Sequence, residues 1–385
     1  MKRPYLFLSL FTALALTLSA CGGSGKPDPT PDPTPTPDPT PDPEPTVTLT
    51  TKVTDHTTEV LQALKSAGVD VKWVQVGNET RNGMLWDAGR LWTDKGDIAD
   101  GWKHYAQLSN AGYDAVKKVY SSAKVIVHLN NTFEDNAWWF KKFKDAGGKF
   151  DLIGLSHYPM ADNYDGSTKL SADECNTRAI NQIKALATAN SCDVMITEVG
   201  VKQSDVAKGK ACLEAFMTAA RGIDRCIGVF YWEPEVDGSW KPAIYNKIPS
   251  AWGGGSWNAY DSGAFTTDGK PTAILDPFKT TRNDWARGAD VSWCTEMEKG
   301  GRKFKDADGK ETDLFQLLKG LGMTAVRLRV WVNPQDGWCG KDDVVAKARR
   351  AKDAGLDILI DFHYSDFFAD PGRQVVPDAW KNLSL

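Results

Sequence analysis

Two glutamates, Glu79 and Glu198, each stand at the end of an apolar run, "WVQVGNE" and "DVMITE". Taken alone, either residue is as well explained by a loop carboxylate that caps a helix or pairs with an arginine. Two carboxylates at strand ends that face one cleft can instead divide the work of acid–base chemistry. One stays protonated and donates to a leaving oxygen, while the other stays ionised and attacks carbon or assists water. That division is what glycoside hydrolysis requires.

The neighbours of these glutamates fit the same chemistry. The amide of Asn78 can hydrogen-bond a sugar hydroxyl in the transition state, although closing a turn explains it equally well. Glu233 in "YWEPEV" is a third candidate carboxylate, ranked below the other two because the following proline indicates a fixed loop position.

Tryptophan is abundant, with 15 residues. Indole rings stack on the apolar faces of sugars, so a groove lined by tryptophan would suit a polysaccharide. Trp73 and Trp285 are expected in the core. The tryptophans in loop-like places are Trp86, Trp92, Trp240, Trp252, Trp257, Trp338 and Trp380.

The elements that must position these side chains alternate between short β-branched runs and helix-like stretches, which predicts parallel strands joined by helices. No glycine-rich phosphate loop is present, so a (β/α)₈ TIM barrel is favoured over a doubly wound sheet. The carboxyl ends of the strands would then meet at one face. The predicted strands are 73–79, 124–130, 151–158, 193–200, 227–234, 287–293, 325–334 and 357–366, and helix-like stretches include 57–68, 139–148, 313–322 and 343–355.

The first 46 residues are unlike the rest. Residues 1–21 resemble a bacterial lipoprotein signal, and "LSAC" predicts cleavage before Cys21 and lipid attachment there, with an ordinary secretory signal as the alternative. Residues 22–46 form a Pro/Thr/Asp-rich linker of semi-rigid, extended character. A folded domain is therefore expected over 47–385, held at the bacterial cell envelope or secreted.

The composition limits which classes of molecule the protein is expected to bind. With 46 basic and 50 acidic residues the formal charge is -4, which does not suit nucleic-acid binding. Six cysteines follow the linker in a chain that is expected to be exported, so both disulfides and free buried thiols are open, while their spacing matches no zinc pattern. These are Cys175, Cys192, Cys212, Cys226, Cys294 and Cys339.

A family resemblance rests on long motifs that span nearly all of 51–385. "GADVSW", "VRLRVWVNP", "DFHYSDFFADPG", "WVQVGNETRNGMLW", "ITEVG" and "GVFYWEP" resemble glycoside hydrolase family 53, the arabinogalactan endo-β-1,4-galactanases. The resemblance implies a retaining (β/α)₈ hydrolase in which Glu79 is the acid/base and Glu198 is the nucleophile. No organic cofactor is expected, and the protein is expected to be a monomer.

The resemblance also assigns substrate-binding roles. Arg327 would sit beneath the nucleophile and keep it ionised. Trp86 would stack in a neighbouring subsite, and Asn130 stands where the family often has aspartate. Bacterial members imply a structural calcium in late loops, for which Asp237, Asp261 and Asp268 lie in the right region, although spacing alone defines no site. The subsite that holds the sugar being cleaved would be lined by Asn78, Tyr158, Trp232 and His363.

The order of the motifs departs from the family. "GADVSW" opens the family sequence and the "GNE" strand comes fourth, whereas here "GNE" comes first and "GADVSW" sixth. Joining "PDAWKNLSL" to "TTKVTDHTTEVLQALKSAGV" restores the family order. This predicts a circularly permuted barrel with strand order 4-5-6-7-8-1-2-3, in which residues 51–279 are the family's C-terminal part and 280–385 its N-terminal part.

The function expected from the resemblance is endo-hydrolysis of internal β-1,4-galactosidic bonds in pectic galactan. Two alternatives stay open. Because a fold does not fix its substrate, the sugar could be another β-1,4-linked polysaccharide, a glucan or a mannan. The chain could also be a catalytically impaired lipoprotein that binds galactan without cleaving it.

Overall fold

The computed structural model describes residues 47–160, 170–247, 261–279 and 284–385. The chain divides into two units, Met1–Pro45 and Thr46–Leu385. The second unit carries all the described elements. None of its described helices combines the length and the apolar character needed to cross a bilayer.

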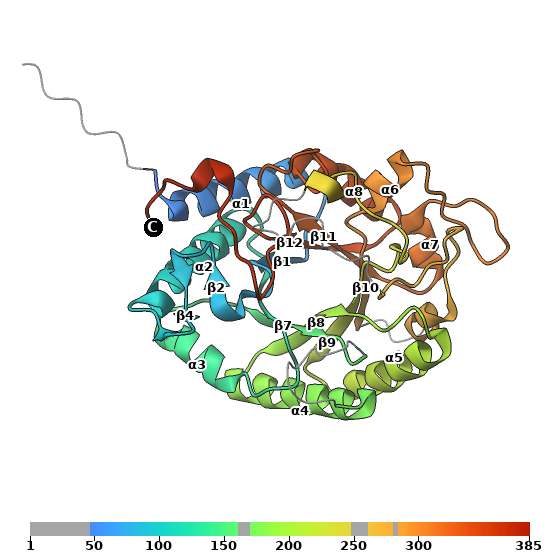
Figure 1. The fold of residues 1–385 in the computed structure, drawn as a ribbon, viewed down its shortest axis with the longest axis horizontal. Coiled ribbons are helices and arrows are strands. Elements are labelled where there is room, and N and C mark those ends of the chain that lie inside the picture. The colour runs from blue at the N-terminus through green and yellow to red at the C-terminus, as the bar shows by residue number, and fades with distance from the viewer. Residues whose placement is uncertain (1–46, 161–169, 248–260, 280–283) are drawn as a thin grey trace, which may run out of the picture. The chain divides into compact units, whose positions relative to one another are not determined.

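Eight parallel strands form a closed barrel, as the sequence predicts (Figure 1). The observed strands end one to four residues before the predicted ends, because the polar residues that follow turn into loops. Glu79, Glu233 and Tyr364 lie just beyond three strands with positive φ angles of 47°, 48° and 51°, a conformation that is strained for residues other than glycine and common at functional sites. The strands are β1 (Trp73–Val76), β6 (Lys124–Leu129), β7 (Leu152–His157), β8 (Asp193–Val199), β9 (Cys226–Trp232), β10 (Ala286–Asp290), β11 (Ala325–Val330) and β12 (Asp357–Phe362).

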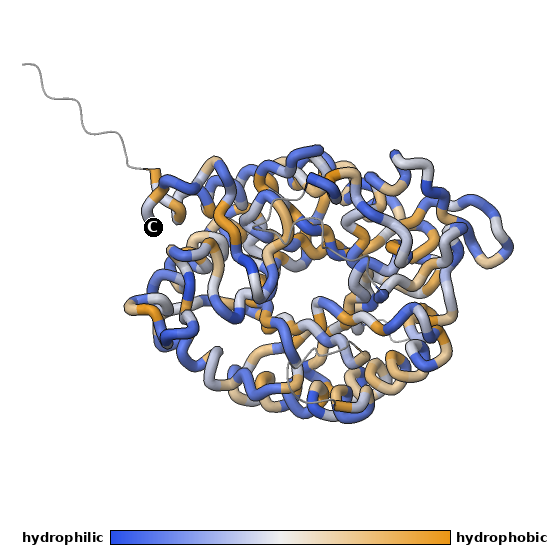
Figure 2. The backbone as a smooth tube through the Cα atoms, in the orientation of Figure 1, coloured by the Kyte–Doolittle hydropathy of each residue, from blue (hydrophilic) through white to orange (hydrophobic). Residues whose placement is uncertain are grey.

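Helices surround the strands in a ring (Figure 1). Figure 2 shows apolar residues along the strands and an alternation of apolar and polar residues along the helices, the pattern of helices with one face on a core. The helices are α1 (Leu49–Ser66), α2 (Gly101–Val119), α3 (Ala137–Asp145), α4 (Ala172–Asn190), α5 (Val206–Arg221), α6 (Cys294–Lys299), α7 (Leu314–Gly320) and α8 (Lys341–Asp353), with 3₁₀ turns η1 (Thr80–Asn82), η2 (Tyr245–Lys247), η5 (Ala273–Phe278) and η6 (Asp378–Trp380).

Two small hairpins interrupt the connection between β1 and α2. The strand pairs are β2 (Gly83–Met84) with β3 (Gly89–Arg90), and β4 (Trp92–Thr93) with β5 (Gly96–Asp97). A Cβ atom on Gly83 would lie 1.8 Å from the carbonyl oxygen of Gly89. Glycine is therefore required for this close approach of two backbones.

The barrel interior is apolar at the amino ends of the strands and polar toward their carboxyl ends. Trp73 and Trp285 are buried, as predicted. The six cysteines after residue 46 are free thiols, so the structure shows the second of the two cysteine alternatives. The lower layer inside the barrel consists of Trp73, Ile126, Leu152, Met195, Phe230, Ala286, Ala325 and Leu359.

The first helix, α1, fills the place in the outer ring that follows the last strand, β12. The described body begins with an α-helix and ends after β12 with only the 3₁₀ turn η6, and α1 packs against both α2 and α8. The amide of Leu49 donates to the carbonyl oxygen of Ser384 at 2.7 Å, and the hydroxyls of Thr57 and Tyr364 are hydrogen-bonded at 2.7 Å. In this fold helices start at the carboxyl ends of the strands. Leu49 and Ser384 therefore lie together on that side of the barrel.

Candidate active site

A cavity of about 320 Å³ opens at the carboxyl ends of the strands. Nine residues were predicted to be catalytic or to bind substrate. Seven of them line the cavity, while Arg327 and Trp86 lie elsewhere. The sequence did not indicate Phe367, Phe368 or Asp370, which follow β12 and form part of the wall. The full lining is Asn78, Glu79, Asn130, Tyr158, Glu198, Trp232, His363, Phe367, Phe368, Ala369, Asp370, Pro371 and Arg373.

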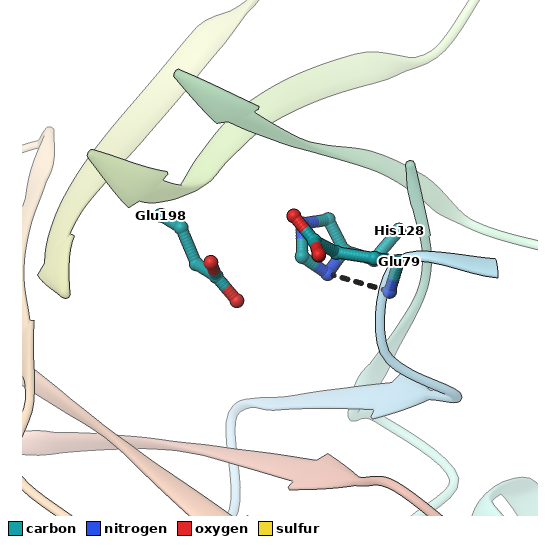
Figure 3. Close-up of side chains that lie close together, drawn as sticks. All are labelled: Glu79, His128 and Glu198. Atoms are coloured by element: carbon teal, nitrogen blue, oxygen red, sulfur yellow. Dashed lines mark hydrogen bonds between the residues drawn. The ribbon is translucent and has the colours of Figure 1, made fainter. Parts of the chain in front are cut away.

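The two candidate catalytic glutamates face each other in this cavity (Figure 3). One carboxylate oxygen of Glu79, one of Glu198 and a ring nitrogen of His128 all lie within 4.8 Å of one another. Glu198 lies in β8, where the register with both neighbouring strands shifts, an irregularity that re-aims a side chain. Carboxyl groups about 5 Å apart suit the retaining reaction, whereas inversion needs about 6.5–9.5 Å to admit a water molecule.

The environment of Glu79 favours its protonated form. Burial is the main cause that raises the pKa of this carboxyl well above its ordinary value, and the nearby charge of Glu198 adds to it. The Ser156 hydroxyl donates to Glu79 Oε1 at 2.6 Å and opposes the rise only in part. Glu79 is therefore suited to donate a proton to a leaving oxygen.

Glu198 has partners that favour its ionised form on both oxygens. Burial raises the pKa of this carboxyl, while Arg327 and then Tyr158 oppose that effect. Arg327 Nη2 lies 2.9 Å from Glu198 Oε1, and the Tyr158 hydroxyl donates to Oε2 at 2.7 Å. Of the two glutamates, Glu198 is the one with a buried cation beside it, so it is suited to act as the nucleophile.

Arg327 lies behind the cavity wall and is 1% exposed. Its guanidinium contacts Asp290 at 2.7 Å and Asp361 at 2.8 Å in addition to Glu198. Burial lowers the pKa of Arg327, but these carboxylates outweigh that effect and leave the pKa raised. It also donates to Asn78 Oδ1 at 2.8 Å. Arg327 therefore contacts two residues of the cavity wall, Glu198 and Asn78, and does not line the cavity itself.

Replacing Arg327 by methionine should destabilise the fold by about 3–5 kcal/mol, because the change leaves buried carboxylates without a counter-charge. The loss should shrink as the pH falls, since Asp361, whose pKa Arg327 helps to lower, can then become protonated. Urea denaturation of both proteins at several pH values measures the difference. Lys72→Met is the matched control: it breaks the exposed Lys72–Asp357 pair and should cost at most about 1 kcal/mol. Equal unfolding midpoints for Arg327→Met and the parent would contradict this role.

His128 belongs to the site although the sequence analysis did not select it. The backbone amide of Glu79 donates to His128 Nδ1 at 3.3 Å, so the ring proton is assigned to Nε2, which lies 2.8 Å from Ser156 Oγ. Burial lowers the pKa of His128 well below its usual value, which keeps the ring neutral. His128, Ser156 and Glu79 thus form a hydrogen-bonded row. The available signal was a histidine inside the apolar strand "VIVHL".

Asn78 and His363 hold the loop after β12. Asn78 Nδ2 donates to the carbonyl oxygen of Ala369 at 2.8 Å, and the amide of Ala369 donates to His363 Nδ1 at 2.9 Å. Asn130 Oδ1, by contrast, is buried without a hydrogen-bond partner. In a site that binds a sugar, Asn130 Oδ1 could therefore accept a hydrogen bond from a sugar hydroxyl.

Of the aromatic residues predicted to bind sugar, Tyr158 and Trp232 border the cavity and Trp86 lies outside it. Tyr158 and Trp232 meet edge to face, with ring centroids 6.0 Å apart. Trp86 lies in an adjacent groove of about 340 Å³, which shares Arg373 with the main cavity. The guanidinium of Arg90 stacks on the Trp86 ring at 4.3 Å, so one face of this indole is already covered.

The third candidate carboxylate, Glu233, is buried and does not line the cavity. It pairs with Arg329 at 2.5 Å. Burial raises the pKa of Glu233 to about 7, against the effect of Arg329. Its position supports its rank below Glu79 and Glu198.

The aspartates considered for calcium do not form a site among the described residues. Asp237 pairs with Arg302, Asp261 accepts from Ser204 at 3.1 Å, and Asp268 accepts from Thr266 at 2.6 Å. Within the described part of the chain, the one group of three side chains close enough to share an ion is Glu79, His128 and Glu198. Trp252 and Trp257 lie outside the described residues.

Comparison with known proteins gives a consistent result. The family model "Glycosyl hydrolase family 53" matches residues 42–278 and 286–385. An endo-β-1,4-galactanase of Bacillus subtilis strain 168 is 45% identical over 110 residues, which cover 26% of this chain and 26% of the relative. A probable arabinogalactan endo-β-1,4-galactanase A of Neosartorya fischeri is 46% identical over 99 residues, which cover 26% of this chain and 28% of the relative.

The chain thus spans about a quarter of the length of the curated relatives it matches. Among solved structures, a fungal β-1,4-galactanase matches with a TM-score of 0.46 and 21% identity, and the match covers 60% of this chain and 68% of the other. A family 53 catalytic domain of Ignisphaera aggregans matches with a TM-score of 0.46 and 19% identity, covering 60% and 64%.

Proposed function

The chain belongs to glycosyl hydrolase family 53, and on this premise we propose that it hydrolyses internal β-1,4-galactosidic bonds in pectic galactan or arabinogalactan, with retention of configuration. The observation that carries the proposal is the pair Glu79 and Glu198, whose oxygens approach within 4.8 Å in a cavity at the carboxyl face of the barrel. The different partners of the two carboxyls support different roles for them.

The reaction takes two steps. In the first, Glu198 attacks the anomeric carbon, the bond to the leaving oxygen breaks, and the proton of Glu79 moves to that oxygen. In the second, Glu79 accepts a proton from water, the water oxygen bonds to the anomeric carbon, and the bond to Glu198 breaks. Tyr158 and Arg327 stabilise the Glu198 carboxylate before and after the covalent intermediate. Asn130 Oδ1, in the cavity wall, accepts a hydrogen bond from a sugar hydroxyl.

A panel of polysaccharides tests the proposal. Purified protein is incubated with β-1,4-galactan, arabinogalactan, a β-1,4-glucan and a β-1,4-mannan, and new reducing ends are measured together with the size of the products. Rapid loss of chain length on galactan alone is the expected result. Cleavage of glucan or mannan instead would show that galactan is not the substrate, since the same two carboxylates can hydrolyse all three polymers. Binding of galactan without any product would support the impaired binding protein.

The proposal includes a circular permutation, with β1 as the family's fourth strand and β10 as its first. Three observations support it: the motif order, the interruption of the family match at residues 279–285, and the position of α1, which follows β12 in space but precedes β1 in sequence. The barrel ring by itself cannot decide, because a closed ring of successive neighbours looks the same whichever strand comes first.

A re-cut chain tests the permutation. We expect a protein that starts at Asp284, runs to Leu385 and continues directly into Val47–Lys279 to fold into the same barrel with comparable activity, because Leu49 and Ser384 are already hydrogen-bonded. The measurements are circular dichroism, thermal unfolding and release of reducing ends. As a control, the same two ends are joined but the chain is opened inside α4, which should prevent folding. An insoluble or unfolded re-cut protein would argue against the proposed order.

We also place the enzyme at the bacterial envelope through lipid on Cys21, a proposal supported by the "LSAC" box and the proline-rich linker. Metabolic labelling with a radioactive fatty acid should mark the parent and not the Cys21→Ser variant. Release of the parent into the medium without label would favour an ordinary secretory signal.

A further inference from the structure

One exposed tryptophan stands out on the described surface. Trp138 is 40% exposed, and the other large hydrophobic side chain exposed among the described residues is Val47, at the start of the body. Trp138 packs against Trp92 and Trp102, with ring centroids 6.1 and 6.2 Å away, and the rings of Trp92 and Trp102 are 6.3 Å apart. These three residues, here called the tryptophan rim, hold the partly exposed indole of Trp138 in place at the surface.

Charged side chains frame the tryptophan rim. Lys142 Nζ lies 5.6 Å from the ring centres of both Trp102 and Trp138, a distance at which a cation is attracted to an aromatic face. The same ammonium pairs with Asp97 at 3.1 Å. The surface thus combines flat apolar rings with exposed groups that can hydrogen-bond hydroxyls.

The tryptophan rim lies on the same side of the barrel as the cavity. Trp92 belongs to β4, in the insertion that follows Glu79, while Trp102 and Trp138 are the second residues of α2 and α3, helices that begin at the carboxyl ends of strands. Figure 1 shows β4, α2 and α3 on one side of the ring.

A short hydrogen-bonded link joins the tryptophan rim to the catalytic glutamate. Trp139, next to Trp138, donates from Nε1 to the carbonyl oxygen of Arg81 at 2.7 Å, two residues after Glu79. Arg81 donates in turn to Asn136 Oδ1 at 3.0 Å. The rim is therefore held rigidly with respect to the cleavage site.

We propose that the tryptophan rim is a second carbohydrate-binding surface, which holds a β-1,4-galactan chain outside the cavity while another part of the same chain is cleaved. The proposal rests on the function proposed above. In galactose the axial hydroxyl at carbon 4 leaves the hydrogens of carbons 3, 4 and 5 on one apolar face, which stacks on indole. Binding one polymer at two places raises its effective concentration at the cavity.

A narrow polymer fits the tryptophan rim better than a folded protein partner does. Stable protein interfaces bury more than about 1,000 Å² and exclude charge from their centre. Here one exposed ring lies beside the exposed ion pair of Lys142 and Asp97. Such a surface matches a single row of sugar rings whose hydroxyls can reach the ion pair.

The test compares Trp138→Ala with Lys141→Ala, a control on the same helix whose side chain pairs with Asp145 away from the rim. We expect Trp138→Ala to raise KM for long galactan by about three- to tenfold, the equivalent of one lost aromatic contact. Its kcat, and its kcat/KM on galactotetraose, should stay at the parent value. Trp138→Phe should recover most of the affinity. Thermal unfolding checks that all three variants are folded.

Binding provides a readout that does not depend on turnover. In a Glu198→Ala background, retardation of the protein in gels that contain galactan should weaken on adding Trp138→Ala and stay unchanged on adding Lys141→Ala. Unchanged KM and unchanged retardation would overturn the inference. An equal loss on long and short substrates would also overturn it. So would a parent that proves to be a dimer and that Trp138→Ala converts to a monomer, because the rim would then be a protein interface. A parent that cleaves no galactan defeats the proposed function, whereas gel retardation that depends on Trp138 would still support the rim.

Discussion

Replacing Glu198 by alanine is expected to reduce galactan hydrolysis by about 10⁴-fold or more, because the residue that forms the covalent intermediate is lost. The fold should survive the change. Arg327 keeps its contacts with Asp290 and Asp361 at 2.7 and 2.8 Å, so the buried cation stays neutralised. Release of reducing ends and thermal unfolding measure the two effects separately.

Added azide provides a direct test of whether Glu198 is the nucleophile. A small anion can enter the space left by the Glu198 carboxylate and attack the anomeric carbon from the same face. With an aryl galactoside, azide should therefore restore part of the rate and give an α-galactosyl azide, visible by NMR. Glu233→Gln is the matched control, since that carboxylate lies outside the cavity, and it should retain turnover. Full activity of folded Glu198→Ala would exclude Glu198 as the nucleophile.

Replacing Glu79 by glutamine should lower the rate on galactan by about 10²–10⁴-fold, the usual contribution of a general acid. The loss should be much smaller for the first step on a dinitrophenyl galactoside, because that leaving group needs no proton. Steady-state and burst kinetics on both substrates separate the two steps. A loss of the same size on both substrates would mean that Glu79 serves another purpose.

The pH profile gives the sign of both assignments. Glu79 must hold its proton for the first step, so activity should fall at high pH as it ionises, and the raised pKa of this carboxyl moves that limb upward. Glu198 must be ionised, so activity should fall at low pH as it gains a proton. In Glu79→Gln the alkaline limb should vanish. In Ser156→Ala it should move to higher pH, because Ser156 lowers the pKa of Glu79.

Much of the fold followed from the sequence because parallel strands inside a barrel are continuous β-branched runs. All eight strands were located, and the barrel was inferred from their alternation with helices. The hairpins β2–β3 and β4–β5 were missed, since two-residue strands carry no periodic pattern and depend on tight backbone contacts such as that of Gly83 with Gly89.

The site was predictable where its residues stand at strand ends and less so elsewhere. Glu79 and Glu198 were found because two carboxylates at the ends of apolar strands that face one cleft can share acid–base chemistry, and Asn130 was found through the family resemblance. His128 and Ser156 lie inside strands, and the shift of register beside β8 that turns Glu198 toward Glu79 has no signature in composition. Stacking of Arg90 on Trp86 depends on a tertiary contact, so no spacing rule could anticipate it.

The contact between Leu49 and Ser384 has a practical consequence for handling the enzyme. Both ends of the barrel body lie on the face of the barrel that carries the active-site cavity, whereas a barrel whose chain starts with a strand begins at the opposite face. Beads or sensor surfaces coupled through either end would therefore hold the mouth close to the support and hinder long polymers. An attachment point on a turn at the amino ends of the strands, such as Gly147, would present the mouth to the solution.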